Sequence, residues 1–388
     1  MPASVVQRYE MFVRVVKLCC GICGANVFKP DYRMNILTWI VIFFINLYFA
    51  FTGYTLYVNI YVEKDWAHIL QVLCFLGSAL QGYCKLFNVI WNKEHFRYMI
   101  DELRLIYTKY SDEHMEYDTC LQKSIKSADK FIKFMAIMHV VVSMCLIGIV
   151  PFYRVVFDQR IFVMHCLFPG VDPNTEYGYL ITNAMHSICI VFGAFGNFAA
   201  DLMFFIFVRH FPLFKDILKC KFHDLNEVIL GDEEQMRSCN ILLKDIIQWH
   251  QNYMRYVTSV KDTYFWVIIV ELATVALSIG STLFCLIMGM WPGGQTYLVY
   301  CFMMLYMYCG LGTVVEVTND DFIRSCYTEV LWYRLPVAEK KMLRMMLMMA
   351  QGTKGLTIGA VIPLNMNTGL QVTKMIYTMT MMLLNFLD

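Results

Sequence analysis

The chain has 388 residues, of which 58% are apolar and only 16% charged, and its formal net charge is +1. Soluble domains are about half apolar and about a quarter charged, so this composition predicts a polytopic membrane protein and excludes a basic nucleic-acid-binding surface. The 15 cysteines lie mostly in apolar segments or basic loops, without a second pair at zinc-ligand spacing, which favours buried reduced thiols over a metal site.

Residues 1–33 carry scattered basic residues and no uninterrupted apolar core before a small-residue cleavage site. This pattern is not that of a signal peptide. We expect residues 1–33 to form a cytoplasmic N-terminal segment.

Seven stretches are long enough, and apolar enough, to cross a bilayer as helices. In chain order they are residues 34–57, 66–91, 131–152, 179–207, 264–290, 295–317 and 369–388. The sequence therefore predicts an all-α membrane protein with seven transmembrane helices, called spans one to seven here. Span seven is the weakest by hydropathy because half of its circumference is polar.

Lys and Arg are distributed unevenly between the loops. The N-terminal segment and the loops after spans two, four and six are rich in them, whereas the alternate loops hold only Lys64, Arg154 and Arg160. Because basic loops stay in the cytosol, this asymmetry predicts a cytoplasmic N-terminus and an extracellular C-terminus.

The cytoplasmic segments show apolar residues at helical spacing. Extensions at 92–130 and 208–263 should lengthen the spans into the cytosol, and 318–368 should hold a further helix and a link to span seven. These amphipathic helices need partners for their apolar faces, within the chain or between chains.

Span seven, residues 369–388, has one half-circumference without a polar group and one that carries most of its polar side chains. The polar positions are Gln371, Thr373, Lys374, Tyr377, Thr378, Thr380 and Asn385. A polar group left in lipid is costly, so this half should face either water or another helix of the bundle.

The C-terminal region resembles the insect odorant receptors. Its cytoplasmic run is similar to the Trp-Tyr through Ala-Gln signature of that family, at Tyr327, Trp332, Tyr333, Lys340, Lys341, Leu343, Met346, Met349 and Gln351. The positions that look like the family's link and final-helix motif are Leu356, Gly359, Pro363, Leu364, Asn365 and Tyr377.

The resemblance implies an odorant-gated, non-selective cation channel in the plasma membrane of sensory dendrites. It also implies a heterotetramer in which tuning subunits join a shared co-receptor, with the last helix at the pore. The loop between spans four and five is shorter than in the co-receptor, which favours a tuning subunit. Two alternatives stay open: a gustatory-type receptor channel, and a seven-span receptor or transporter without its own pore.

The implied partners are therefore the co-receptor, a volatile odorant and membrane lipid, with no nucleic acid and no cofactor. The residues expected at the subunit interface, in the anchor region, are Trp332, Tyr333, Leu343, Met346 and Gln351. The family places its ligand pocket in the outer halves of spans two, three, four and six, where aromatic and Met side chains suit a small apolar ligand. The candidate pocket residues are Trp66, Leu70, Leu73, Ser143, Ile147, Pro151, Tyr179, Asn183, His186, Tyr297, Tyr300, Met303 and Met304.

A stripe along span seven is the candidate pore lining. Thr373, Tyr377, Thr380 and Leu384 are spaced i, i+4, i+7 and i+11, with Asp388 beyond them. An apolar ring at Leu384 would gate by dewetting, and Asp388 would attract cations at the outer mouth. The alternative is that this stripe packs against a neighbouring helix and that the face with Lys374 and Thr378 lines the pore.

The chain shows no catalytic constellation, and we expect a non-enzyme. Lys85, Asp201 and Glu271 lie inside predicted spans. Charges in a membrane are usually paired, so we expect pairing or snorkelling rather than a proton relay. His139 and His186 are expected to be hydrogen-bonded core histidines.

Overall fold

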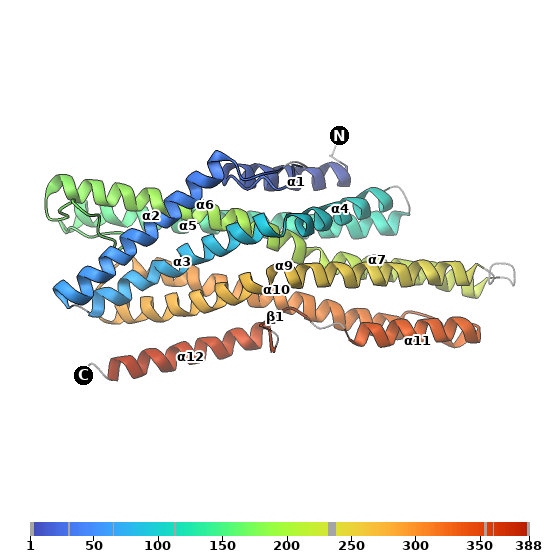
Figure 1. The fold of residues 1–388 in the computed structure, drawn as a ribbon. Coiled ribbons are helices and arrows are strands. Elements are labelled where there is room, and N and C mark those ends of the chain that lie inside the picture. The colour runs from blue at the N-terminus through green and yellow to red at the C-terminus, as the bar shows by residue number, and fades with distance from the viewer. Residues whose placement is uncertain are drawn as a thin grey trace.

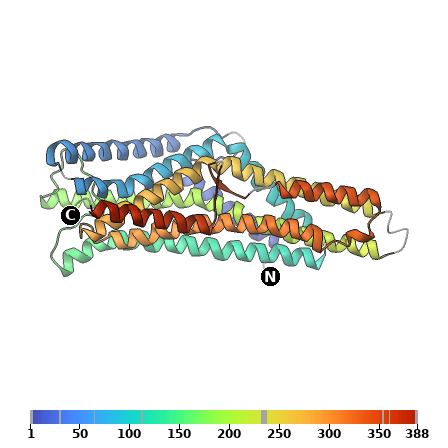
Figure 2. The ribbon, with the colours of Figure 1, turned by 90° about the horizontal axis from the view of Figure 1, so that it is seen from below.

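The computed structural model describes residues 4–29, 32–64, 66–111, 114–231, 238–352, 355–359 and 361–385. This part of the chain is an elongated bundle of helices (Figures 1 and 2). The α-helices are α1 (Val5–Ile22), α2 (Ile36–Tyr57), α3 (Trp66–Trp91), α4 (Lys93–Tyr110), α5 (Met115–Val156), α6 (Glu176–Arg209), α7 (Phe211–Leu230), α9 (Cys239–Ile287), α10 (Gly294–Thr328), α11 (Val337–Gln351) and α12 (Met366–Asn385). The predicted all-α fold is confirmed.

Short elements join some of these helices. A π-helical turn, η1 (Val58–Glu63), follows α2, and a 3₁₀ turn, η2 (Trp332–Arg334), precedes α11. The strands β1 (Thr357–Ile358) and β2 (Ile362–Pro363) pair antiparallel just before α12, with Ile358 opposite Ile362. Leu364, the residue after this hairpin, lies so close to α10 that a Cβ atom at Gly312 would sit 2.0 Å from the Leu364 carbonyl oxygen. The link to α12 is therefore fixed against α10.

Within the described residues, 6 helices are long and apolar enough to cross a membrane, and they contain α2, α3, α5, α6, α9 and α10. These helices correspond to predicted spans one to six. The predicted span seven corresponds to α12, which packs along α9 and α10 in the same half of the molecule (Figures 1 and 2).

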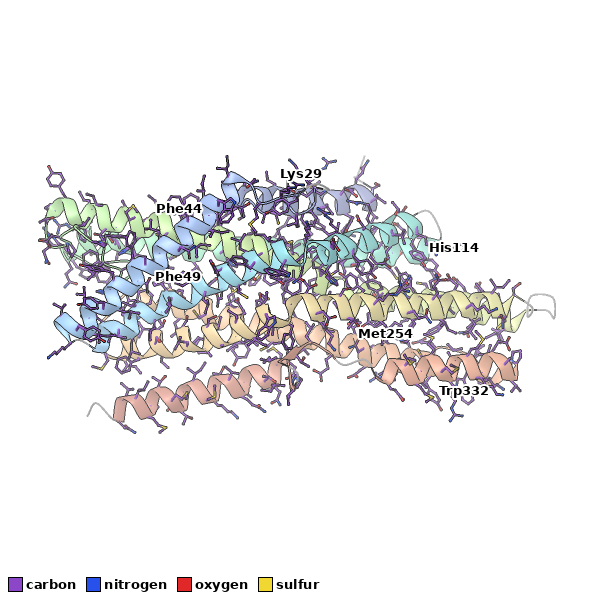
Figure 3. The ribbon with its side chains drawn as sticks, in the orientation of Figure 1. Lys29, Phe44, Phe49, His114, Met254 and Trp332 are labelled. Carbon is purple, nitrogen blue, oxygen red and sulfur yellow. The ribbon has the colours of Figure 1, made fainter. Side chains whose placement is uncertain are left out.

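The outer surface of α2 is apolar. Trp39, Phe43 and Phe44 are 60%, 62% and 59% exposed, and Phe44 marks this surface in Figure 3. Apolar surface of this extent is unfavourable in water but matches a lipid environment. The end of the bundle that contains α2 is therefore the membrane half.

Three helices continue from the membrane half into the opposite half. They are α5 with 42 residues, α9 with 49 and α10 with 35, so α9 alone is about 74 Å long, well over the thickness of a hydrocarbon core. Around their far ends pack α1, α4, α7 and α11 (Figure 1). The predicted helical extensions thus form one body with the spans.

Candidate functional site

Tyr300 on α10 lies where three helices, α5, α6 and α10, meet inside the membrane half. Its hydroxyl is 3.2 Å from His139 Nε2 on α5, and His139 Nδ1 is 2.9 Å from the Met135 carbonyl oxygen. The His139 ring also contacts Phe198 on α6, with ring centroids 5.1 Å apart. His139 is therefore a hydrogen-bonded core histidine, as expected, and it places Tyr300 next to α5 and α6.

Tyr297, one turn before Tyr300, is buried and bonded to α3. Its hydroxyl donates to the Cys74 carbonyl oxygen at 2.8 Å and lies 2.8 Å from Ser78 Oγ, which must then donate to it. Its ring lies 4.6 Å from the ring of Phe75. Met304, on the same helix, is 2% exposed. The predicted residues of α10 thus face the interior between α3, α5 and α6.

A second polar group lies at the N-terminal end of α6, beneath the connection between α5 and α6. The Tyr179 hydroxyl donates to the Ile161 carbonyl oxygen at 3.3 Å, and His186 Nε2 is 3.0 Å from the Cys166 carbonyl oxygen. The connection therefore folds over this end of the bundle.

Two acceptor atoms remain unpaired beneath this connection. Asn183 Oδ1 and His186 Nδ1 are buried, and among the described residues neither has a hydrogen-bond partner. Because His186 Nε2 donates to a carbonyl, its Nδ1 carries a lone pair, as does the amide oxygen of Asn183. Unpaired buried acceptors are unfavourable, so a hydroxyl or N–H group that reached these two atoms would be stabilised by donating to them.

The remaining candidate pocket residues that the structure describes are less buried than Tyr297 and Met304. Leu70, Leu73, Ser143, Ile147 and Met303 are partly buried, and the Ser143 hydroxyl donates to the His139 carbonyl oxygen at 2.8 Å. Pro151 is exposed on the surface of α5, so the structure does not bring it to the others. The side chain of Trp66 lies outside the described residues. Residues that the sequence did not single out, Ser78, Phe75 and Phe198, complete the interior contacts.

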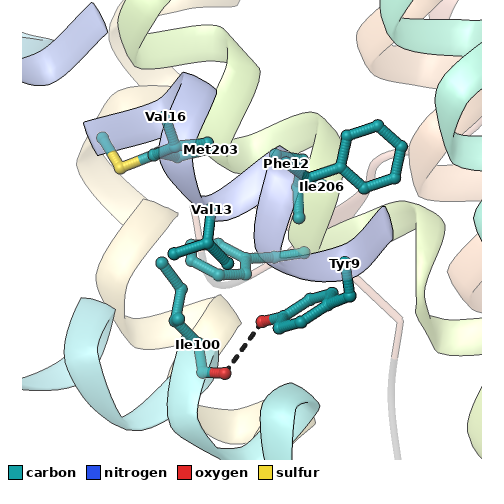
Figure 4. Close-up of a pocket in the computed structure, with 8 residues that line it drawn as sticks. Tyr9, Phe12, Val13, Val16, Ile100, Met203 and Ile206 are labelled. Atoms are coloured by element: carbon teal, nitrogen blue, oxygen red, sulfur yellow. Dashed lines mark hydrogen bonds between the residues drawn. The ribbon is translucent and has the colours of Figure 1, made fainter. Parts of the chain in front are cut away.

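Two cavities in the described part of the chain lie away from the candidate pocket residues. One, of about 10 Å³, lies between α1, α4 and α6 beside Tyr9, whose hydroxyl donates to the Ile100 carbonyl oxygen at 2.8 Å (Figure 4). This volume is about that of a single water probe, so it cannot hold an organic ligand. A second, of about 330 Å³, is open and lined by charged groups that include Lys221 and Asp224. Neither cavity is lined by a candidate pocket residue.

The ionisable groups inside the spans form one cluster. Lys85 Nζ lies 2.7 Å from Asp201 Oδ1 and 2.8 Å from Glu271 Oε2, and all three side chains are at most 4% exposed. The Tyr308 hydroxyl donates to Asp201 at 2.6 Å. The expected pairing is confirmed, and the cluster joins α3, α6, α9 and α10.

The helix α12 presents two different faces. Ile376 and Thr380 are 5% and 1% exposed and form an inner face against the bundle, where the Thr380 hydroxyl donates to the Ile376 carbonyl oxygen at 2.9 Å. Gln371, Lys374, Thr378 and Asn385 are exposed and form what we call the outer polar face.

The predicted pore stripe lies partly inside the bundle. Thr373 and Leu384 are partly buried, and the Thr373 hydroxyl is 3.0 Å from that of Tyr306. Thr380 is buried, and Tyr377 alone of these four is exposed, at 61%. Asp388 lies outside the described residues.

Some of the anchor residues are exposed and others are buried. Trp332 and Tyr333 are 39% and 58% exposed, Gln351 is exposed, and Trp332 projects from the end of the bundle near α11 (Figure 3). Leu343 and Met346 are buried within this chain. On the opposite side of α11, Met345, Met348 and Met349 are 68%, 63% and 64% exposed. The expected interface residues did not include these three methionines, because the two positions chosen on α11 itself by helical spacing, Leu343 and Met346, lie on the face that packs inward.

Comparisons with known protein sequences all match this chain to odorant receptors. The sequence model of a family described as 7tm odorant receptor matches residues 65–377. The Drosophila melanogaster protein named odorant receptor 83c is 25% identical over 395 residues, covering 97% of both chains.

Solved structures share the fold. The olfactory receptor OR5 of Machilis hrabei in complex with eugenol aligns with a TM-score of 0.73 at 17% identity, over 97% of this chain and 99% of that one. A second structure of the same OR5 aligns with a TM-score of 0.75 at 15% identity, over 97% of this chain and 98% of that one.

Proposed function

This chain belongs to the 7tm odorant receptor family, and we propose that it is a tuning subunit which binds a small volatile ligand and gates a non-selective cation pore. In this proposal it joins the shared co-receptor in a heterotetramer, in the plasma membrane of sensory dendrites, with its N-terminus in the cytosol. Family membership confirms that it is a multi-pass membrane protein and a receptor rather than an enzyme.

The single observation that carries the channel proposal is the outer polar face of α12. Gln371, Lys374, Thr378 and Asn385 are exposed on a helix that runs beside the spans. Polar side chains exposed to hydrocarbon are unfavourable, whereas a water-filled path shared between subunits satisfies them. We therefore place the pore on this face, with Tyr377 at its edge, in preference to the buried Thr380.

The ligand site that we propose lies between the Tyr300 meeting point and the N-terminal end of α6. The aromatic surface of Tyr297 and Tyr300 supplies contact area, and the free acceptors on Asn183 and His186 need a donor. This combination suits a small, mainly apolar molecule with one hydroxyl group. The structural relative solved with eugenol, a phenol, supports a ligand of this kind.

Assembly is supported by the exposed apolar side chains of α11 and η2. Met345, Met348 and Met349 lie with Trp332 and Tyr333 on the surface of the half opposite the membrane. An apolar patch that faces water marks an interaction site, and its place in the fold suits a contact between subunits.

The deciding experiment is current recording from cells that express the full chain with and without a co-receptor. An alcohol or phenol should evoke a cation current with the co-receptor present, and its methyl ether should be a weaker agonist, because it cannot donate to Asn183 or His186. Odorant binding with no current in either condition would favour a receptor without its own pore.

The pore assignment is tested by cysteine substitution and a charged thiol reagent applied in the odorant-activated state. Lys374→Cys and Thr378→Cys should be blocked, while Ile376→Cys and Thr380→Cys on the inner face should not. Block confined to the inner-face pair would overturn the placement of the pore on the outer polar face.

A further inference from the structure

Helices α5 and α7 meet along a seam of paired side chains in the half opposite the membrane. From one end of the seam, the Tyr117 hydroxyl donates to Asp224 Oδ2 at 2.5 Å, and Lys123 Nζ donates to Asp216 Oδ2 at 2.9 Å. At the far end, the guanidinium of Arg209, the last residue of α6, donates to the Ser127 hydroxyl. As the residue numbers increase along α5, from 117 to 127, the numbers of their partners decrease from 224 to 209. The two helices therefore run antiparallel.

Between the first two pairs lie two thiols. Cys120 Sγ on α5 and Cys220 Sγ on α7 are 3.7 Å apart. Cys120 follows Tyr117 by three residues and precedes Lys123 by three, while Cys220 lies four residues from both Asp216 and Asp224. Residues three and four apart share one face of a helix, so the pairs on either side hold the thiols in register.

This geometry is close to that of a disulfide. A disulfide needs a sulfur separation of about 2.05 Å, so the two atoms must approach by about 1.7 Å, a distance within the reach of side-chain rotation and a small helix shift. Cys120 is partly exposed, whereas Cys220 is 7% exposed. A small oxidant therefore reaches Cys120 first, and Cys220 is the thiol positioned to react with the product.

We propose that Cys120 and Cys220 form a reversible redox site that takes hydrogen peroxide or a similar small peroxide. The Cys120 thiolate attacks the peroxide, the O–O bond breaks, and a sulfenic acid and one water result after proton transfer. The Cys220 thiol then displaces the sulfenic hydroxyl as a second water and forms the disulfide. Two thiols lose two electrons in total, and the peroxide is reduced to two waters.

The disulfide joins α5 to α7 across the seam. Since α5 continues into the membrane half next to Tyr300, the bond restrains a helix that contacts the proposed ligand site. On the predicted cytoplasmic side, glutathione keeps thiols reduced, so the bond forms during an oxidant pulse and is later reversed. This inference is independent of the proposed ligand and pore.

The test uses the full chain in membranes, treated with hydrogen peroxide, alkylated, digested and analysed by mass spectrometry. We expect one new linked species that joins the peptide of Cys120 to the peptide of Cys220 and is lost on treatment with dithiothreitol. Free Cys120 and free Cys220 should disappear in equal amounts. Cys120→Ser and Cys220→Ser should each abolish the linked species, and Cys145→Ser, at an exposed position of the same helix, should leave it unchanged.

The wild-type result alone decides the proposal, even if a serine variant does not fold. Oxidation of Cys120 to sulfenic or sulfinic acid while Cys220 stays free would overturn it. Linked peptides that pair either thiol with another cysteine would overturn it as well, and so would a failure of both thiols to react under conditions that oxidise free cysteine in a parallel sample.

Discussion

Removing the ammonium of Lys85 should destabilise the fold far more than removing the charge of its partner Glu271. Two carboxylates, Asp201 and Glu271, lie 2.7 and 2.8 Å from Lys85 Nζ, and all three groups are at most 4% exposed. Lys85→Met leaves both carboxylates buried without a cation. Breaking a buried ion pair in this way costs about 3–5 kcal/mol, which lowers the ratio of folded to unfolded protein by about a hundredfold or more.

The cluster contains one ammonium group and two carboxylates, so losing the cation and losing one carboxylate have different effects. Glu271→Gln leaves Lys85 paired one-to-one with Asp201, which also keeps the hydrogen bond from Tyr308. We expect this variant to stay within about 1 kcal/mol of the wild type, because it removes a surplus buried charge. The triple change Lys85→Met, Asp201→Asn, Glu271→Gln should recover most of the stability that Lys85→Met loses.

The measurement is the thermal denaturation of detergent-solubilised protein, followed by size-exclusion chromatography with fluorescence detection. Lys374→Met, the same change at an exposed position, serves as the control. If Lys85→Met melts with the wild type, or if Glu271→Gln is as damaging as Lys85→Met, the cluster does not act as a charge-compensated unit and the reasoning is wrong.

Other variants test the ligand site, the membrane orientation and the assembly. Tyr300→Ala should weaken activation by the best odorant by about 1–3 kcal/mol in a concentration-response assay, whereas Tyr300→Phe, which keeps the ring, should lose less. The chain has no Asn-x-Ser/Thr sequon, so one added after Asp388 should be glycosylated and one inserted near Asp232 should not; the opposite pattern would reverse the predicted orientation. Met345→Glu combined with Met348→Glu should reduce assembly, seen as a smaller particle in size-exclusion chromatography, since charge is disfavoured in the core of an apolar interface.

The course of the helices was predictable, because long apolar runs and basic loops leave few alternatives. The predicted second span, residues 66–91, coincides with α3, and the extensions predicted at 92–130 and 208–263 are helical over most of their described length. The pairing of Lys85 followed from the cost of an isolated charge in a membrane. The β1–β2 hairpin could not be predicted from an apolar run or a charge pattern. Its position depends on a tertiary contact, the close approach of Leu364 to Gly312 on α10.

The rotation of α12 was not predictable from its sequence. Thr and Tyr are spread across the polar half of the helix, and a Thr hydroxyl can donate to a carbonyl of its own helix, as Thr380 does to Ile376. Such a residue is satisfied whether it faces water or protein. The partners of the candidate pocket residues were also hidden, because Ser78 and Phe198 meet Tyr297 and His139 only after four helices have packed.

Because α9 is one helix of 49 residues, a movement at one of its ends can be transmitted as a rigid-body tilt to the other end. No proline interrupts it, and it has one end in the membrane half and the other beside α7 and α11. A tilt of about 2° about the middle of a rod about 74 Å long displaces each end by about 1.3 Å, comparable to a small packing rearrangement. Since α12 packs along α9, we expect a substitution at the far end of α9 to change odorant sensitivity although it contacts neither the proposed ligand site nor the proposed pore.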